Sequence, residues 1–198
     1  MTKDTKWSID QTHSEITFKV KHLMISNVTG TFKTFDGSIY TTGNDFKTAE
    51  IDLWIDASSI STGDEKRDEH IKNGDFFDVE NHKQITFKSS TIAEAGPDGS
   101  HELWGELTMK GITKKVKLNV QFGGIQNDPW GNEKAGFTVT GKINRNDWGL
   151  IWNTPLESGG VMLSEEIKIS CEVELTKSKQ TDLTLELAES AAKKQTTN

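Results

Sequence analysis

Apolar and polar residues alternate along most of this chain, and the alternation restricts its fold more than any other feature of the sequence. In residues 15–22, Ile16, Phe18 and Val20 alternate with threonine and lysine. Successive side chains of a strand point to opposite faces, so this pattern is typical of a half-buried strand. The alternation recurs, in places more weakly, at residues 28–40, 49–56, 84–93, 101–109, 115–122, 137–143 and 167–175. The sequence therefore predicts about eight strands.

Short turns separate the predicted strands, as at residues 97–100, 110–111 and 128–132. Strands joined by such short connections pair in the antiparallel sense, and a closed barrel leaves no edge strand unpaired. Apolar residues make up 33% of the 198 residues, which suits a sheet with one wet face. We therefore predict an all-β fold, an antiparallel eight-stranded barrel spanning residues 1–176. A polar tail at 177–198 has the apolar spacing of a weak helix.

One segment breaks the alternation and predicts a short helix around residues 63–73. Thr62 with Glu65 three residues later has the spacing of a capping box. Arg67 and His70 then share one face of the helix. We weigh two interpretations of this face: a solvated helix surface with internal ion pairs, and a polar lid at the mouth of a barrel.

Charge and cysteine content restrict the partners and the compartment. Acidic residues number 30 against 23 lysines and arginines, a net charge of −7, so nonspecific nucleic-acid binding is not expected. The single cysteine, Cys171, excludes an internal disulfide. Its place on an apolar strand face favours a small buried hydrophobe over a reactive thiol. We see neither a signal peptide nor a transmembrane segment, and expect a cytoplasmic protein.

Five histidines raise the question of a metal site. His13, His22, His70, His82 and His101 form no HxH or HExxH pair, the local spacing at which two imidazoles bind one metal ion. We therefore expect no metal, no cofactor and no catalytic residue. A site assembled across the fold by the first three of these histidines is kept as the alternative, which would make the protein a small metal-dependent enzyme.

The aromatic residues allow two interpretations each. Trp54 falls on the polar face of its strand. It either belongs to a contact surface, such as a dimer interface, or is a singly exposed side chain. Inward aromatics such as Phe87 and Phe122 either fill a solid core or line a hollow one, because an eight-stranded barrel has just enough room for a slender ligand. Composition does not decide between a filled and a hollow interior.

Four groups of residues, spread in order over about residues 6–176, resemble the YceI-like family. The first is Trp7-x-Ile9-Asp10-x-x-His13-Ser14-x-Ile16-x-Phe18-x-Val20-x-His22, with Gly30-x-Phe32 and Gly37 after it. The second comprises Ser61-Thr62, Arg67-Asp68-x-His70, Asp75-Phe76-Phe77-Asp78 and Ile85-Thr86-Phe87. The last two are Gly105-x-Leu107-Thr108-x-x-Gly111-Ile112-Thr113-x-x-Val116 and Arg145-x-Asp147-Trp148-Gly149-Leu150. One departure is His82-Lys83, where many members have an aromatic residue and proline.

The resemblance implies a lipocalin-like barrel that binds a polyisoprenoid or similar long amphiphile in an apolar tunnel, without catalysis and often as a homodimer. A polyprenyl phosphate or a quinone tail would be carried, stored or sequestered. The implied tunnel residues are Phe18, Val20, His22, Phe32, Leu53, Ile55, Phe87, Leu107, Met109, Phe122, Phe137, Val139, Ile143 and Trp148. The implied partners of a head group are Arg67, His70 and Arg145. A filled barrel acting as a stress-related interaction module is a further alternative.

Overall fold

The fold is known from a computed structural model that describes residues 4–93, 96, 99–157 and 159–178. The predicted helical tail therefore lies almost wholly outside the described residues. Within them, no helix is both long enough and apolar enough to cross a lipid bilayer.

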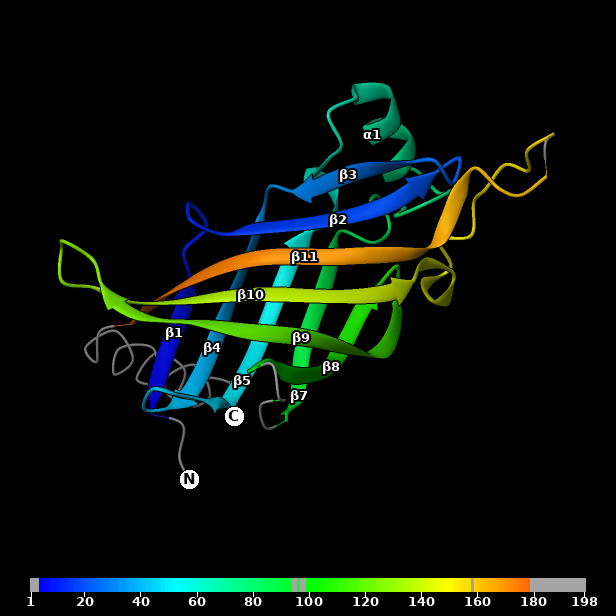
Figure 1. Cartoon of the computed structure of the whole chain (residues 1–198). Coiled ribbons are helices and arrows are strands. Elements are labelled where there is room, and N and C mark those ends of the chain that lie inside the picture. Colours follow the sequence, from blue (N-terminus) through cyan, green and yellow to red (C-terminus); the bar gives the residue numbers. More distant parts are fainter. Residues whose placement is uncertain (1–3, 94–95, 97–98, 158, 179–198) are drawn as a thin grey trace, which may run out of the picture.

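The described residues form strands, one α-helix and two short 3-10 helices, η1 and η2 (Figure 1). The first strands are β1 (Thr5–Ile9), β2 (Glu15–His22), β3 (Ser26–Phe32), β4 (Phe35–Thr42), β5 (Asp45–Asp56) and β6 (Ile60–Ser61). The later strands are β7 (Gln84–Ile92), β8 (His101–Met109), β9 (Ile112–Asn127), β10 (Glu133–Asn144) and β11 (Leu163–Lys177). The helices are η1 (Ala57–Ser59), α1 (Glu65–Lys72) and η2 (Arg145–Trp148).

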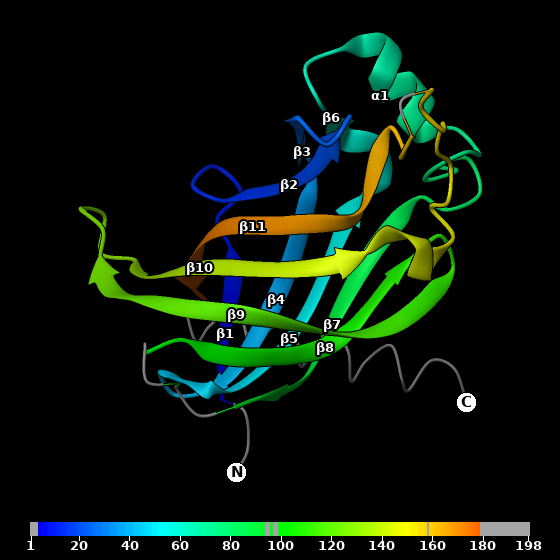
Figure 2. The same ribbon diagram turned by 45° about the vertical axis from the view of Figure 1, so that its right-hand side comes forward.

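Eight of these strands close into an antiparallel barrel, which confirms the predicted lipocalin-like fold. The ring runs β1-β4-β5-β7-β8-β9-β10-β11 and closes where Trp7 of β1 lies opposite Lys177 of β11. Strands β2, β3 and β6 continue the sheet from β11. In Figures 1 and 2 the strands β9, β10 and β11 cross steeply over β1, β4 and β5 on the other wall.

Strand β11 pairs with two different strands along the same edge. Its residues 163–172 pair with β2, whereas residues 175–177 pair with β1.

The chain turns a corner between β1 and β2, and a second corner separates β3 from β4 at Lys33 and Thr34, which are both exposed. The alternation had predicted one strand over 28–40, and it missed β1. At the second corner two exposed residues follow each other, so the alternation cannot continue in one straight strand.

The apolar faces of the strands point into the barrel, as the alternation predicts. Trp7 is fully buried between β4 and β11, and its Nε1 atom donates a hydrogen bond to Thr41 Oγ1 at 3.1 Å. Two glycines make room for aromatic rings on this inner surface. A β-carbon at Gly30 or at Gly105 would lie 2.3 Å from a ring carbon of Phe18 or of Phe87, respectively.

The predicted helix is present as α1, but the expected capping box is wrong. Asp64 is the N-cap residue, and its Oδ1 atom accepts a hydrogen bond from the backbone N–H of Arg67 at 2.9 Å. Thr62 lies outside the helix, where its hydroxyl donates to Asp68 Oδ1 at 2.5 Å. Gly63 has a positive φ of 80°, so the chain changes direction between Thr62 and the helix.

Candidate functional site

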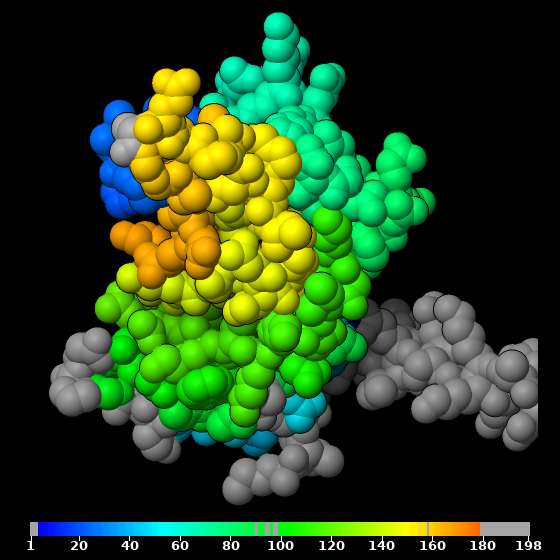
Figure 3. All heavy atoms as spheres, turned by 90° about the vertical axis from the view of Figure 1, so that its right-hand side faces the viewer, coloured from blue at the N-terminus to red at the C-terminus, as the bar shows by residue number. Residues whose placement is uncertain are grey.

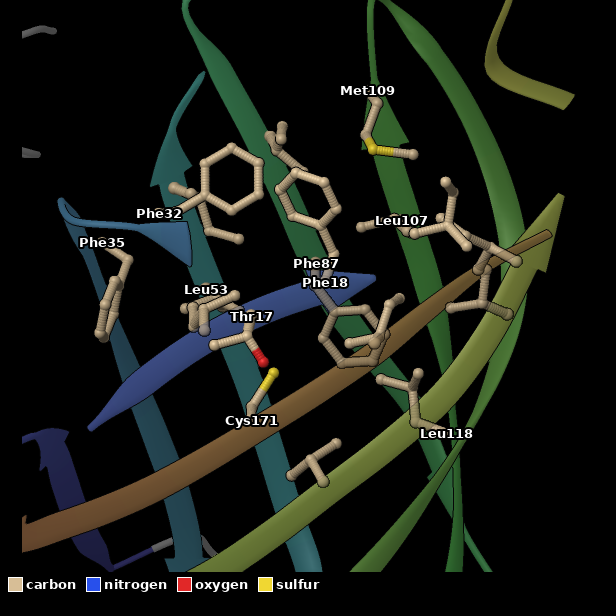
Figure 4. Close-up of a pocket in the computed structure, with 18 of the residues that line it drawn as sticks. Thr17, Phe18, Phe32, Phe35, Leu53, Phe87, Leu107, Met109, Leu118 and Cys171 are labelled. Atoms are coloured by element: carbon tan, nitrogen blue, oxygen red, sulfur yellow. The ribbon is translucent and has the colours of Figure 1, made fainter. Parts of the chain in front are cut away.

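The barrel contains a cavity of about 810 Å³. All of the predicted tunnel residues line it except Trp148. Figure 4 shows the interior, where side chains such as Phe18, Leu53, Phe87 and Leu118 project from different strands toward the same space. The barrel is therefore hollow, and its inner surface is almost entirely aliphatic and aromatic.

The sulfur of Cys171 forms part of this lining (Figure 4). Burial raises the pKa of the Cys171 thiol to about 12. The thiol therefore stays protonated at neutral pH, and a thiolate nucleophile is not available. This chemistry favours the interpretation of Cys171 as a small buried hydrophobe.

Polar groups gather at the end of the cavity below α1, where Thr62, Arg67 and His70 line it. Arg67 is fixed by two hydrogen bonds, from Nε to Thr62 Oγ1 at 2.7 Å and from Nη2 to the Thr62 carbonyl at 2.8 Å. Its Nη1 atom has no hydrogen-bond partner among the described residues. The guanidinium is thus held in position at the cavity end with donors left for a further acceptor.

His70 is oriented by one carboxylate and two aromatic rings. Its Nε2 atom lies 2.9 Å from Asp75 Oδ2. The rings of Phe76 and Trp152 meet the imidazole edge to face, with centroids 5.2 and 4.8 Å from it. Trp152 also lines the cavity, yet the sequence analysis missed it because it lies in an irregular segment without alternation.

Arg145 also borders the cavity, but backbone carbonyl groups occupy its guanidinium. The side chain is only 3% exposed, and burial lowers its pKa. Nε donates to the carbonyl of Ser164 at 3.0 Å, and Nη1 donates to the carbonyls of Leu150 and, at 2.9 Å, Trp152. Arg145 therefore fastens the segment after η2 to the beginning of β11, a role that the sequence did not suggest.

Trp148 is the one predicted tunnel residue that does not reach the cavity. Strand β10 ends at Asn144, and Arg145–Trp148 form the 3-10 helix η2, so the alternation of a strand no longer applies. The indole is 2% exposed, and its Nε1 atom donates to the carbonyl of Leu107 at 3.0 Å. Trp148 packs behind the wall and supports β8.

A cluster of aromatic rings lines the cavity at the end away from α1. Phe46, from the β4–β5 hairpin, lies with its ring centroid 5.7 Å from Phe122 and 4.8 Å from Phe137. Phe122 is 47% exposed, so this end also approaches the surface. The alternation does not identify Phe46, because this residue precedes the alternating run that begins at Ala49.

The proposed metal set of His13, His22 and His70 is not assembled. Within the described part of the chain, one group of metal-ligating type is close enough to bind an ion, and it combines His13 with Asp10 and Glu174. The ammonium of Lys134 already lies there, 2.5 Å from Asp10 Oδ2 and 3.2 Å from Glu174 Oε1. This group is an internal ion-pair cluster between the β1–β2 corner, β10 and β11.

The ion-pair cluster also controls the ionisation of Asp10. Burial raises the pKa of the Asp10 carboxyl, but hydrogen bonds from Lys134, Thr12 and His13 outweigh it and hold the pKa well below 3.8. The carboxylate in turn raises the pKa of Lys134. Both groups are charged at neutral pH, so the cluster joins the β1–β2 corner to β10 and β11 through ion pairs.

Comparison with known proteins identifies the family. The family model for the YceI-like domain matches residues 7–175. This chain belongs to the YceI-like family. A UPF0312 protein of Staphylococcus aureus (strain N315) is 39% identical over 173 residues, which cover 87% of this chain and 98% of that protein.

Solved structures of similar proteins show the same fold. A YceI protein of Campylobacter jejuni superposes with a TM-score of 0.70 at 30% identity, covering 81% of this YceI-like chain and 91% of the other. A polyisoprenoid binding domain from Saccharophagus degradans has a TM-score of 0.60 at 18% identity, covering 87% and 98% of the two chains. At 18% identity the likeness to the polyisoprenoid binding domain is one of fold alone.

Proposed function

We propose that this YceI-like protein binds a long apolar chain, most simply a polyisoprenoid, in the barrel cavity and carries, stores or sequesters it. The observation that supports the proposal best is the closed barrel with a cavity of about 810 Å³ inside an apolar wall. This volume lies within the range of roughly 300–1,000 Å³ that is usual for ligand pockets, which suits a ligand of the size of geranylgeraniol. The fold shared with a polyisoprenoid binding domain agrees with this class of ligand.

The driving force in this proposal is the transfer of apolar surface out of water. Each methylene group that leaves water contributes about 0.8 kcal/mol, before the cost of ordering the chain is subtracted. The wall has few polar groups along its middle, so it discriminates little between chains of equal width. Chain length and branching then decide which ligands fit.

The polar end below α1 is the proposed place for a head group. Arg67 and His70 are proposed as its partners, since both line the cavity and Arg67 keeps free donors among the described residues. A guanidinium binds phosphate through charge-assisted hydrogen bonds. Arg145 is not retained as a partner, because it is 3% exposed and its Nε and Nη1 atoms already donate to three backbone carbonyls.

Binding rather than catalysis is proposed for two reasons. The thiol of Cys171 stays protonated, and Lys134 fills the group of metal-ligating type in the described part of the chain. The homodimer, the contact role of Trp54 and the cytoplasmic compartment remain predictions. A filled interaction module is disfavoured, because the interior is hollow.

Two neighbouring residues of β5 provide a matched test of the cavity. Leu53 lines the cavity, whereas Trp54 is 37% exposed on the outer face. We expect Leu53→Gln to weaken binding of geranylgeraniol about tenfold, because an amide buried against the chain loses its hydrogen bonds to water. Trp54→Gln is expected to leave binding unchanged. Native mass spectrometry of the loaded proteins measures both, and equal binding by the two variants would contradict the proposal.

A second pair of ligands tests the head-group end. Arg67→Gln is expected to weaken binding of geranylgeranyl monophosphate about tenfold, the loss of one charged hydrogen bond, and to leave geranylgeraniol unaffected. If both ligands are weakened equally, Arg67 supports the fold of α1 and does not bind the phosphate.

A further inference from the structure

The two ends of the cavity are built differently. At the polar end, the α1 region and the segment between η2 and β11 lie side by side (Figure 3), and Arg67, His70 and Trp152 line the cavity there. At the other end the lining comes from the β4–β5 hairpin, which lies away from α1 in Figure 1, and from Phe122 and Phe137. If a head group binds below α1, the tail of the ligand lies at this second end.

The ring of Phe46 reaches from one wall of the barrel to the opposite wall. Phe46 lies near the beginning of β5, and β5 and β10 are four steps apart in either direction around the ring of eight strands. The centroid of its ring nevertheless lies 4.8 Å from that of Phe137 on β10 and 5.7 Å from that of Phe122 on β9. The indole of Trp7 on β1 lies 4.9 Å away. Aromatic rings pack against each other at such separations, so Phe46 crosses the lumen at this end.

An irregularity in the pairing of β4 with β5 explains why Phe46 points inward. The residues of β5 that line the cavity between positions 49 and 55 are odd-numbered, so Phe46 would face outward if that alternation continued. The register between the two strands shifts between Tyr40 and Thr42, close to the hairpin. A bulge of this kind changes the direction of a side chain.

Polar contacts fasten the same hairpin to the opposite wall. Nδ2 of Asn44 donates to Glu133 Oε1 at 2.7 Å, and Nζ of Lys177 donates to Asn44 Oδ1 at 2.8 Å. Glu133 begins β10 and Lys177 ends β11. The hairpin therefore spans the end of the barrel, and its attachment holds Phe46 across the lumen.

We propose that Phe46 limits the length of the apolar chain that the cavity accepts, because the tail of the longest ligand ends against its ring. The other hairpin residues that line the cavity, Asn44, Asp45 and Lys47, are polar and exposed. An apolar tail gains nothing by extending past the ring toward them, since it would stay in water. The inference rests on the proposed function, because it states which chains the same cavity binds.

The affinity for all-trans prenols of increasing length, from geraniol to solanesol, tests the proposal. Each methylene group that leaves water strengthens binding by up to roughly fourfold. We therefore expect the affinity to rise with chain length until the tail reaches Phe46 and then to stop rising. Native mass spectrometry of the protein with equal amounts of two prenols measures their relative affinities.

Two substitutions of Phe46 should move this limit in opposite directions. Phe46→Ala removes a ring about the size of one isoprene unit, so the limit is expected to move to chains about one unit longer. The first prenol beyond the limit of the parent protein should then bind about tenfold more tightly. Phe46→Trp places a larger ring in the lumen, and the longest prenol that the parent protein accepts should bind about tenfold more weakly. Thermal unfolding checks that each variant is folded, and Phe46→Trp tests the limit by itself if Phe46→Ala is not.

A phenylalanine at the polar end provides the matched comparison. Phe77 also lines the cavity, and its ring meets that of Phe32 edge to face with centroids 5.9 Å apart. Phe77→Ala removes the same ring but leaves the far end closed. It is expected to weaken the binding of all prenols by a similar factor, through lost contacts with the wall, and to leave the length limit in place.

Three results would overturn the proposal: an affinity of the parent protein that keeps rising up to solanesol, an equal shift of the limit in Phe46→Ala and Phe77→Ala, or an unchanged limit in Phe46→Trp. The second result would show that the total volume of the cavity sets the length. A parent protein that binds none of the prenols would refute the proposed function, and this inference with it, so the two failures are distinguishable.

Discussion

Two glycines under the cavity-lining rings allow a quantitative test of how this wall is packed. Gly30→Ala and Gly105→Ala make the same chemical change, and each new β-carbon would lie 2.3 Å from a phenylalanine ring carbon. Neither glycine has a positive φ, so alanine fits the backbone at both positions. The two substitutions differ only in what surrounds the new methyl group.

At Gly30 the three nearest atoms all belong to the ring of Phe18, which can swing into the empty cavity. Alanine also restricts the unfolded chain, which stabilises the protein by about 0.4–1 kcal/mol and offsets part of the crowding. At Gly105 the new β-carbon would in addition lie 2.6 Å from the backbone carbonyl oxygen of Lys88. Because the sheet holds that oxygen in place, we expect the full cost of overpacking, about 3 kcal/mol.

Urea and thermal unfolding of the two variants measure this difference. We expect Gly30→Ala to stay within about 1 kcal/mol of the parent protein, and Gly105→Ala to melt about 4–8 °C lower than Gly30→Ala, for a difference of about 2 kcal/mol. Gly30→Ala should still bind geranylgeraniol more weakly, because the Phe18 ring then occupies part of the cavity. Equal stabilities of the two variants, or unchanged binding by Gly30→Ala, would refute this account of the wall.

Three further predictions follow from groups around the cavity. Arg145→Met is expected to lower the free energy of unfolding by about 3–5 kcal/mol in urea titrations, because three backbone carbonyls lose their donor; an unchanged midpoint would contradict this. Asp10→Asn is expected to cost about 1.5–3 kcal/mol at neutral pH. Because the folded-state pKa of Asp10 lies below 3.8, the deficit should shrink as the pH falls below that value; a deficit independent of pH would show that the charge plays no part. Cys171, with its pKa near 12, should react with iodoacetamide at pH 8 far more slowly in the folded than in the urea-unfolded protein, and equal rates would place the thiol at the surface.

The sequence predicted the barrel and most of the cavity wall because both depend on a period of two. Each inward position along an alternating strand also faces the cavity, so residues such as Phe18, Leu53 and Val139 were identified without a structure. That the barrel is hollow could not be derived from composition, since the same inward residues would serve in a filled barrel. Only their arrangement around an empty volume decides it.

The errors concern segments where the alternation stops. Trp152 and Phe46 lie outside alternating runs, and Trp148 follows the end of one, so no periodic signal describes their direction. The role of Arg145 depends on carbonyl groups brought together by the fold, which no side-chain pattern encodes. At α1 the capping box predicted at Thr62 is wrong, because the backbone turns at Gly63 and Asp64 caps the helix instead.

The closure of the ring between β1 and β11 has a consequence for how the protein reaches its native state. Trp7 and Lys177 are partners although they lie about 170 residues apart in the sequence. Contacts of such long range are slow to form, because a large loop must lose its freedom before the strands stabilise each other. During synthesis the edges of β1 and β10 stay unpaired until β11 has left the ribosome. We therefore expect closure to be a late folding step, and unclosed chains to be the species most prone to aggregate or to need a chaperone.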